Sequence, residues 1–277
     1  MKKWLYLFLC CYQLAVAAPL QKINVLLDWA ANPNHAALFV AQQQGFFQRE
    51  GLAVNLTAPA DPTDPLKLVA AGQFDIGISY QHSVRLARKQ HLPIQVIGNL
   101  IDTPLSTVMV LADSPVKKLQ DLKGKRIAIS GSKPSQHLQT MLAHVGLTLQ
   151  DVQLIQVHYN IAQALLTRGV DASSDVFRNV EPLELKLKGI KTRLFYPEDY
   201  GVKPYPALVI IMHKPLDKRL AEKFMLAVNA GKTYWHAHPK QTWQAFAKTH
   251  PALDSPANQA IWVKTAALLV AHKYGFS

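Results

Sequence analysis

The clearest structural pattern in the chain lies in residues 22–56, KINVLLDWAANPNHAALFVAQQQGFFQREGLAVNL. Residues 22–29 have the apolar composition of a strand. Residues 35–44 have helical spacing and are followed by Gly45, a residue type that commonly ends helices. Residues 52–56 alternate apolar and polar side chains, as a half-buried strand does. This order of strand, helix and strand predicts one unit of an open parallel sheet with helices on both faces.

The same alternation continues on both sides of a break near residue 107. Before the break, residues 74–79 and 94–100 predict strands and residues 83–89 a helix. A further helix is predicted at Asp64, the expected N-cap, with Pro65 at the first helical position. After the break, residues 119–130 predict a short helix, a turn at Gly124 and a strand. The other predicted strands are 108–111, 152–157, 171–176 and 207–212, and the predicted helices are 136–145, 162–166 and long helices after residue 212.

This pattern predicts two α/β lobes, with the second inserted into the first. The first lobe is expected to comprise residues 18–107 and 199–277, and the second lobe residues 108–198. Two lobes joined by two chain crossings form a hinged clamp that holds a ligand in the cleft between them. A doubly wound enzyme has the same alternation, so the periodicity leaves both classes open.

Residues 1–17 have the features of a secretory signal peptide. Lys2 and Lys3 precede an apolar run at residues 4–12, and residues 15–17 (AVA) form a small-x-small cleavage pattern. The apolar run is shorter than the ~20 residues that span a bilayer. We therefore expect cleavage after residue 17 and a periplasmic mature protein. Cys10 and Cys11 both lie in this segment, so the mature chain has no thiol, disulfide or cysteine-based metal site.

The chain is basic, with a formal net charge of +12 from 30 basic and 18 acidic residues. Loss of the signal peptide leaves +10, from 28 basic and 18 acidic residues. The basic residues are scattered, and their densest group, within residues 117–126, flanks a predicted turn and strand. We interpret them as a solvated surface and expect no nucleic-acid partner. No dinucleotide, phosphate-loop or serine-hydrolase motif is present, and we expect neither a metal nor a cofactor.

Five ordered segments are distributed over nearly the whole mature chain: residues 27–35 (LDWAANPNH), 59–72 (PADPTDPLKLVAAG), 75–81 (DIGISYQ), 177–181 (FRNVE) and 195–202 (FYPEDYGV). Together they resemble the thiamine-pyrimidine solute-binding proteins, whose group also contains the fungal-type pyrimidine synthases. The resemblance implies a two-lobed periplasmic-binding-protein fold (type II), in which each lobe is a sheet flanked by helices. It also implies a monomeric, non-enzymatic receptor of an ABC importer. Such a receptor closes on formylaminopyrimidine or hydroxymethylpyrimidine and delivers it to an inner-membrane permease.

The resemblance also implies which residues hold a pyrimidine. Trp29 and Tyr80 each follow a predicted strand, the position where such sheets present ligand contacts. We expect them to stack on the ring, an interaction worth about 1–3 kcal/mol per nucleobase, with Tyr205 as a further wall. Glu181 is the candidate acceptor for the exocyclic amine and the protonated ring nitrogen, and Glu184 is the alternative.

Asn32 and His35 stand at the entry of the first helix, where polar groups can meet ligand substituents. A role of His35 in capping or orienting that helix has equal weight. Residues 130–132 (SGS) form either an anion-binding nest or a plain turn. No catalytic or metal-ligating residue is expected.

Three departures from the family bear on activity. Ala31 replaces a usual proline, which loosens a loop without removing a ligand contact. The synthases' cysteine-rich segment corresponds to residues 203–207, which contain no cysteine, and their catalytic lysine and histidine align with Ser79 and Ser83. These differences favour a binding protein over a synthase-like enzyme. The remaining rival is a binding protein for a sulfonate, taurine-like or nitrate-like anion.

Overall fold

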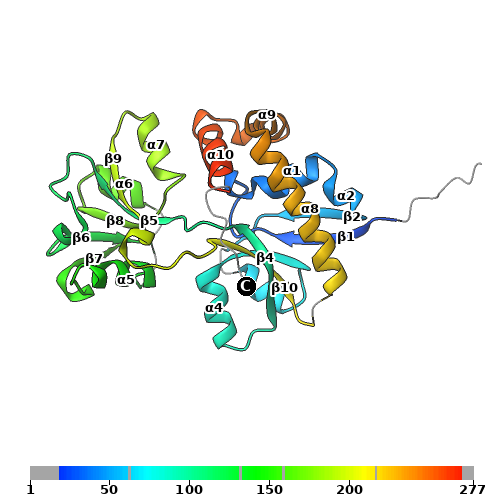
Figure 1. The fold of residues 1–277 in the computed structure, drawn as a ribbon, viewed down its shortest axis with the longest axis horizontal. Coiled ribbons are helices and arrows are strands. Elements are labelled where there is room, and N and C mark those ends of the chain that lie inside the picture. The colour runs from blue at the N-terminus through cyan, green and yellow to red at the C-terminus, as the bar shows by residue number, and fades with distance from the viewer. Residues whose placement is uncertain (1–18, 62–63, 131–132, 158–159, 216, 270–277) are drawn as a thin grey trace, which may run out of the picture.

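The computed structural model describes residues 19–61, 64–130, 133–157, 160–215 and 217–269, and it has two lobes, each built around a five-stranded sheet (Figure 1). In spatial order, the first sheet contains β2 (Leu52–Thr57), β1 (Gln21–Leu26), β3 (Ile76–Tyr80), β10 (Leu208–His213) and β4 (Ile94–Ile101). The second sheet contains β7 (Gln153–Gln156), β6 (Arg126–Ile129), β8 (Ala172–Phe177), β5 (Ser106–Leu111) and β9 (Thr192–Phe195).

Helices cover both sheets, and the two-lobed architecture predicted from the sequence is confirmed. Those of the first lobe are η1 (Pro33–His35), α1 (Ala36–Gln43), α2 (Phe46–Arg49), α3 (Asp64–Ala70), α4 (Gln81–Lys89), α8 (Lys218–Ala237), α9 (Pro239–Thr249), η5 (Pro251–Leu253) and α10 (Pro256–Leu268). Those of the second lobe are η2 (Leu119–Leu122), α5 (Gln136–His144), η3 (Leu149–Asp151), α6 (Ile161–Leu166), α7 (Glu181–Leu187) and η4 (Pro197–Tyr200).

Most predicted elements occur within a few residues of their expected bounds. Gly45 adopts the positive φ of 72° expected after the first helix, and Gly124 adopts 73° in the predicted turn. Helix α3 begins at Asp64, one position earlier than predicted, and the carboxylate of Asp64 accepts the backbone N–H of Asp61. The sequence pattern did not predict β9, whose pairing partner β5 is distant in sequence, or α7, which is only partly buried.

The open parallel sheet expected from the alternation is observed only in part, because both sheets are mixed. Strands β1, β2 and β3 are parallel, as are β6, β7 and β8. By contrast, β10 is antiparallel to β3 and β4, and β5 is antiparallel to β8 and β9. Both strands follow a direct crossing from the other lobe instead of a covering helix, so they enter their sheet from the opposite end. Strand periodicity carries no information on direction.

The chain passes between the sheets twice, after β4 and after β9. The expected boundary between residues 107 and 108 falls inside β5, and that between residues 198 and 199 falls inside η4. We propose the links at residues 102–105 and 201–207 as the divisions between lobes. Near them, the fully buried Asn179 of the second lobe donates to Asn34 Oδ1 and Thr265 Oγ1 of the first lobe, at 2.7 Å each.

Each lobe has its own apolar core. In the first lobe, α1, α8, α9 and α10 bury a cluster of aromatic side chains that includes Trp235, Trp262 and Phe246. The core of the second lobe is built mainly of aliphatic residues between its sheet and α5. Two separate cores joined by two links allow the lobes to move as units, and the ends of several strands lie where the lobes meet.

Candidate functional site

The candidate site is formed where strand ends of the two sheets face one another. In the first sheet, β1 leads to Asp28 and Trp29, and β3 ends at Tyr80. In the second sheet, β8 ends at Phe177, whose backbone pairs with Ser106 at the start of β5. The carboxyl ends of parallel strands are where open α/β sheets place ligand contacts. This arrangement explains why residues far apart in the sequence converge where the two sheets approach each other.

A buried carboxylate, Asp28, organises the first-lobe side of the site. The Nε2 atom of the fully buried His35 lies 2.7 Å from Asp28 Oδ1. His35 Nδ1 accepts the backbone N–H of Asn32 at 3.3 Å, so the ring proton is on Nε2 and is donated to Asp28. The hydroxyl group of Tyr80 also hydrogen-bonds Asp28. Asp28 thus fixes both the first helix entry and the Tyr80 ring.

The pKa of Asp28 lies below its ordinary value. Burial alone would raise this pKa, but the hydrogen bonds from His35 and Tyr80 outweigh it. Because the folded-state pKa is depressed, the stability that Asp28 contributes is complete above the unfolded-state pKa. It is lost as the pH falls through the lower folded-state pKa.

We therefore expect Asp28→Asn to lower the free energy of unfolding by about 1–2 kcal/mol at pH 7, because the amide offers one oxygen to two donors. Urea unfolding at pH 7 and at progressively lower pH measures this, and the difference from the wild type should shrink on acidification. Asp254→Asn removes a carboxylate from an exposed loop and should change stability by less than about 0.5 kcal/mol. An equal loss for both variants would contradict the role of Asp28.

Asn32 and His35 hold the helix entry together. Asn32 is the N-cap of η1, and its Oδ1 accepts the backbone N–H of Asn34 at 2.9 Å. Its Nδ2 donates to the carbonyl of Ala30 at 2.9 Å. His35 completes the capping box from a fully buried position. These contacts show that both residues cap the helix entry. A ligand contact of Asn32 or His35 stays a prediction.

Aromatic rings from the two lobes approach each other at the site. The centroids of Tyr80 and Phe177 are 6.5 Å apart, with an interplanar angle of 53°. Tyr80 also stacks on His82 of α4, at 5.6 Å and 26°. Phe177 packs against the first-lobe core although it belongs to the second sheet. Phe177 thus joins the second sheet to the Tyr80 side of the first lobe.

Glu181 lies beside this pair of rings. It is the first residue of α7, and its Oε2 accepts the backbone N–H of Phe177 at 2.8 Å. Burial raises the pKa of Glu181 to about 7, and the charge of Glu184 adds to the rise. Hydrogen bonds from the backbone N–H groups of Glu181 and Phe177 oppose it. Near neutral pH this carboxyl group therefore exists both as an acceptor and as a donor.

Tyr205 lies on the second-lobe side. Its ring stacks on His137 of α5 at 4.3 Å and 14°, and its hydroxyl is 3.2 Å from His137 Nδ1. Burial raises the pKa of Tyr205, and a hydrogen bond with Ser106 opposes that rise. Burial lowers the pKa of His137 to about 4, with the charges of His82 and Arg85 adding to the effect, so His137 is neutral at pH 7.

The predicted residues thus form separate groups around the cleft. Tyr80, Asn32 and His35 connect through Asp28, Glu181 joins them through Phe177, and Tyr205 sits with His137. Trp29 follows Asp28 directly and is 37% exposed. Sequence reasoning missed Asp28, Phe177 and His137 as site residues. Two of them stood in recognised segments, directly before Trp29 and Arg178, but they were not assigned a role.

Two negative findings apply to the described part of the chain. Within it, no helix has both the length and the apolar character needed to cross a bilayer. Nor do any three His, Cys, Asp or Glu side chains there group closely enough to hold a metal ion. The candidate anion nest at residues 130–132 lies partly outside the described residues, because Gly131 and Ser132 are not among them.

Comparison with known proteins agrees with this fold. Residues 32–242 match the family described as NMT1/THI5 like. A Haemophilus influenzae protein, named provisionally for thiamine biosynthesis, is 40% identical over 253 residues, covering 90% of this chain and 80% of that protein. The formylaminopyrimidine-binding protein of Halalkalibacterium halodurans is 30% identical over 255 residues, covering 91% and 77%.

Enzymes also occur among the relatives. The 4-amino-5-hydroxymethyl-2-methylpyrimidine phosphate synthase of Uromyces fabae is 29% identical, covering 87% of this chain and 74% of the enzyme. Among solved structures, the periplasmic aliphatic sulphonate-binding protein of Escherichia coli superposes with a TM-score of 0.73 at 16% identity, covering 88% and 79%. At that identity the structural likeness establishes the periplasmic-binding-protein fold alone.

Proposed function

Because the chain belongs to the NMT1/THI5-like family and has a periplasmic-binding-protein fold, we propose that it captures a thiamine-precursor pyrimidine for an ABC importer. The ligand is formylaminopyrimidine or hydroxymethylpyrimidine. The two lobes close around it, and the closed form presents it to an inner-membrane permease. Ligand stabilises the closed form only through contacts that it makes better there.

The observation that carries this proposal is the pair of rings from opposite lobes with a carboxyl group beside them. A flat ring between two others needs about 3.5 Å on each side. The Tyr80 and Phe177 centroids are 6.5 Å apart and tilted, so a small opening of the lobes admits one ring. The backbone N–H of Phe177 holds the carboxyl group of Glu181 beside the two rings. Two aromatic faces and an edge carboxyl group match an aminopyrimidine better than a sulfonate or nitrate.

Binding without chemistry is part of the proposal. The synthases of this family carry a catalytic lysine and histidine where the chain has Ser79, buried in β3, and Ser83 in α4. A hydroxyl group in place of an amine or imidazole lacks the basicity that proton transfer or imine chemistry requires. We therefore infer that the ligand leaves the cleft unchanged.

A thermal-shift series tests the function, with hydroxymethylpyrimidine, formylaminopyrimidine, thiamine, taurine and nitrate as probes. A ligand at a hundred times its Kd should add about 2.7 kcal/mol of stability. We expect a clear rise in Tm with at least one pyrimidine and none with taurine or nitrate. A rise with the anions alone would overturn the pyrimidine assignment. Mass spectrometry of the bound molecule after denaturation should return the added pyrimidine, whereas an altered mass would reveal an enzyme.

We also propose export to the periplasm as a monomer. The supporting segment, residues 1–17, lies outside the described residues. N-terminal sequencing of protein from a periplasmic fraction should begin at Ala18, and chromatography with light scattering should give the mass of one chain. Recovery of the full-length chain from the cytoplasm would refute export.

A further inference from the structure

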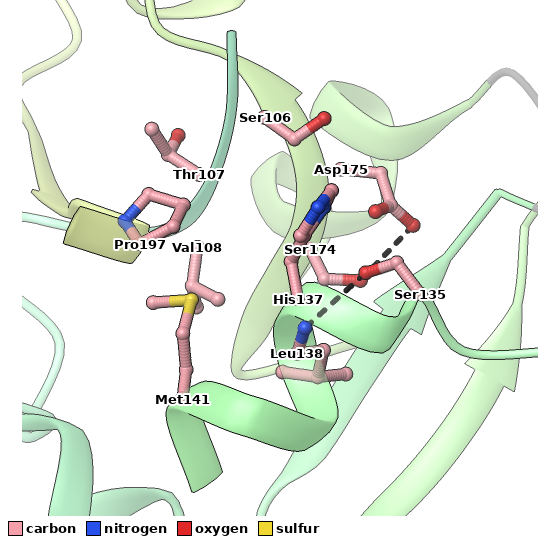
Figure 2. A pocket seen from close by; sticks show the side chains of 10 residues that line it. All are labelled: Ser106, Thr107, Val108, Ser135, His137, Leu138, Met141, Ser174, Asp175 and Pro197. Carbon is pink, nitrogen blue, oxygen red and sulfur yellow. Dashed lines mark hydrogen bonds between the residues drawn. The ribbon is translucent and has the colours of Figure 1, made fainter. Parts of the chain in front are cut away.

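A small pocket lies in the second lobe (Figure 2), and its lining residue Ser106 pairs with Phe177 of the aromatic pair. Ser106, Ser135, His137, Ser174 and Asp175 provide its polar lining, from β5, β8 and the start of α5. Its volume of about 10 Å³ corresponds to about one water molecule. A whole pyrimidine ring does not fit, but a single substituent of hydroxyl size does.

Asp175 gives this pocket its charge. Its backbone adopts a φ of 61°, an uncommon conformation for a residue other than glycine. The residue lies where the pairing of β5 with β8 is irregular, between Ser173 and Val176, which pair with Met109 and Thr107. Ser174 Oγ lies 3.3 Å from Asp175 Oδ2, as the dashed line in Figure 2 shows. Asp175 thus presents a carboxylate on the pocket wall.

The other groups facing the pocket are neutral or positive. The His137 imidazole is paired with the Tyr205 hydroxyl and is neutral at pH 7. His82 and Arg85 of α4 act electrostatically from the first lobe, His82 on Asp175 and both on His137. The start of α5, capped by Ser135, also adds positive potential. A phosphate group would nevertheless lie against the Asp175 carboxylate in a space of about one water molecule, so it would meet both a steric limit and direct repulsion from that carboxylate.

We propose that this pocket receives a hydrogen-bond-donating substituent of the ligand, a hydroxyl or amide N–H donated to Asp175, and excludes a phosphate at the same position. This inference rests on the proposed function, and it makes the protein selective for unphosphorylated pyrimidines. The chemistry is complementary, because a carboxylate accepts a donated hydrogen bond and repels an oxyanion.

Isothermal titration with three probes tests the inference. They are 4-amino-5-hydroxymethyl-2-methylpyrimidine, its phosphate ester, and 4-amino-2,5-dimethylpyrimidine, which lacks the hydroxyl. We expect the wild type to bind the hydroxymethyl compound about tenfold or more tighter than either other probe. In Asp175→Asn, which tolerates the same backbone conformation, the advantage over the dimethyl compound should fall about tenfold. Binding of the dimethyl compound should stay unchanged, and binding of the phosphate ester should improve.

Asp113→Asn removes an equal charge from the exposed surface of the same lobe and should leave all three affinities as they are. Thermal unfolding checks that each variant folds. Phosphate-ester binding as tight as that of the hydroxymethyl compound would overturn the inference. An equal change in affinity for all three probes in Asp175→Asn would also overturn it. Either outcome would leave the proposed function intact. Failure of all three probes to bind the wild type would overturn the proposed function and this inference with it.

Discussion

Replacement of Glu181 by alanine is expected to weaken binding of a 4-aminopyrimidine by about tenfold to hundredfold. In the proposed complex, the carboxyl group of Glu181 pairs with the exocyclic amine and the adjacent ring nitrogen, and a hydrogen bond of this charged type contributes about 1.5–3 kcal/mol. Isothermal titration with hydroxymethylpyrimidine measures the loss. The same substitution frees the Phe177 N–H, so the free energy of unfolding must be measured alongside.

Glu184→Ala is the matched control for this experiment. It removes a carboxylate from the next turn of α7 and also tests the alternative assignment made from the sequence. We expect Glu184→Ala to bind hydroxymethylpyrimidine within about twofold of the wild type, as a change without direct ligand contact should. A larger loss in Glu184→Ala than in Glu181→Ala would transfer the role to Glu184.

Glu181→Gln separates the charge of the group from its shape. The pairing requires one proton, shared between the ring nitrogen and Glu181, whose pKa is about 7. Wild-type affinity should therefore fall above pH 7, by up to about tenfold per pH unit. The amide of Glu181→Gln always offers a donor and an acceptor, so its affinity should be constant between pH 7 and 9. Parallel pH profiles for the two proteins would refute the shared proton.

The stability of the unliganded protein gives an independent readout of the same group. The folded-state pKa of Glu181 is raised from 4.5, so the neutral acid favours folding. This contribution is complete below pH 4.5 and is lost as the pH rises through about 7. Relative to Glu181→Gln, the wild type should lose stability across that interval.

Local patterns predicted the elements of the fold better than their arrangement. Residues 22–56 gave β1, α1 and β2 because alternation and helical spacing are properties of neighbouring residues. The direction of β5 and β10 was missed because it depends on which lobe the chain has just left. The strand β9 was missed because it pairs only with β5, an element distant in sequence.

The candidate site divides in the same way. Trp29, Tyr80 and Glu181 could be proposed because they stand in segments with a family resemblance or directly after predicted strands. The hydrogen-bond network that holds Tyr80 was missed. Asp28 and His35 are seven residues apart, and nothing else in the sequence marks them as a buried pair. Asp175 was missed because its conformation is set by the irregular pairing of β8 with β5.

A close approach of two helices in the first lobe leads to the largest stability effect that we expect. A Cβ atom at Gly231 of α8 would lie 2.4 Å from the backbone oxygen of Ala37 in α1 and 3.0 Å from Ala41 Cβ. Backbone atoms of a packed helix cannot yield locally, so α8 must move away from α1. Overpacking of this kind lowers the free energy of unfolding by about 1–3 kcal/mol. Alanine stabilises a helix by ~1 kcal/mol relative to glycine, but the clash is with backbone atoms. We therefore expect Gly231→Ala to lose about 3 kcal/mol.

Gly98→Ala is the control. Its added Cβ atom would approach a neighbour about as closely, but that neighbour is a side chain and not backbone. A Cβ atom there would lie 2.3 Å from Met225 Cε and 2.6 Å from its Sδ, the far end of a flexible side chain. Met225 also lines a groove between β4 and α8 into which its side chain can turn. We expect Gly98→Ala to change the free energy of unfolding by less than about 1 kcal/mol. Urea denaturation with an unchanged m-value compares the two variants directly. If they were equally destabilised, the identity of the obstructing atom would not matter, and the rigidity assigned to the α1–α8 contact would be wrong.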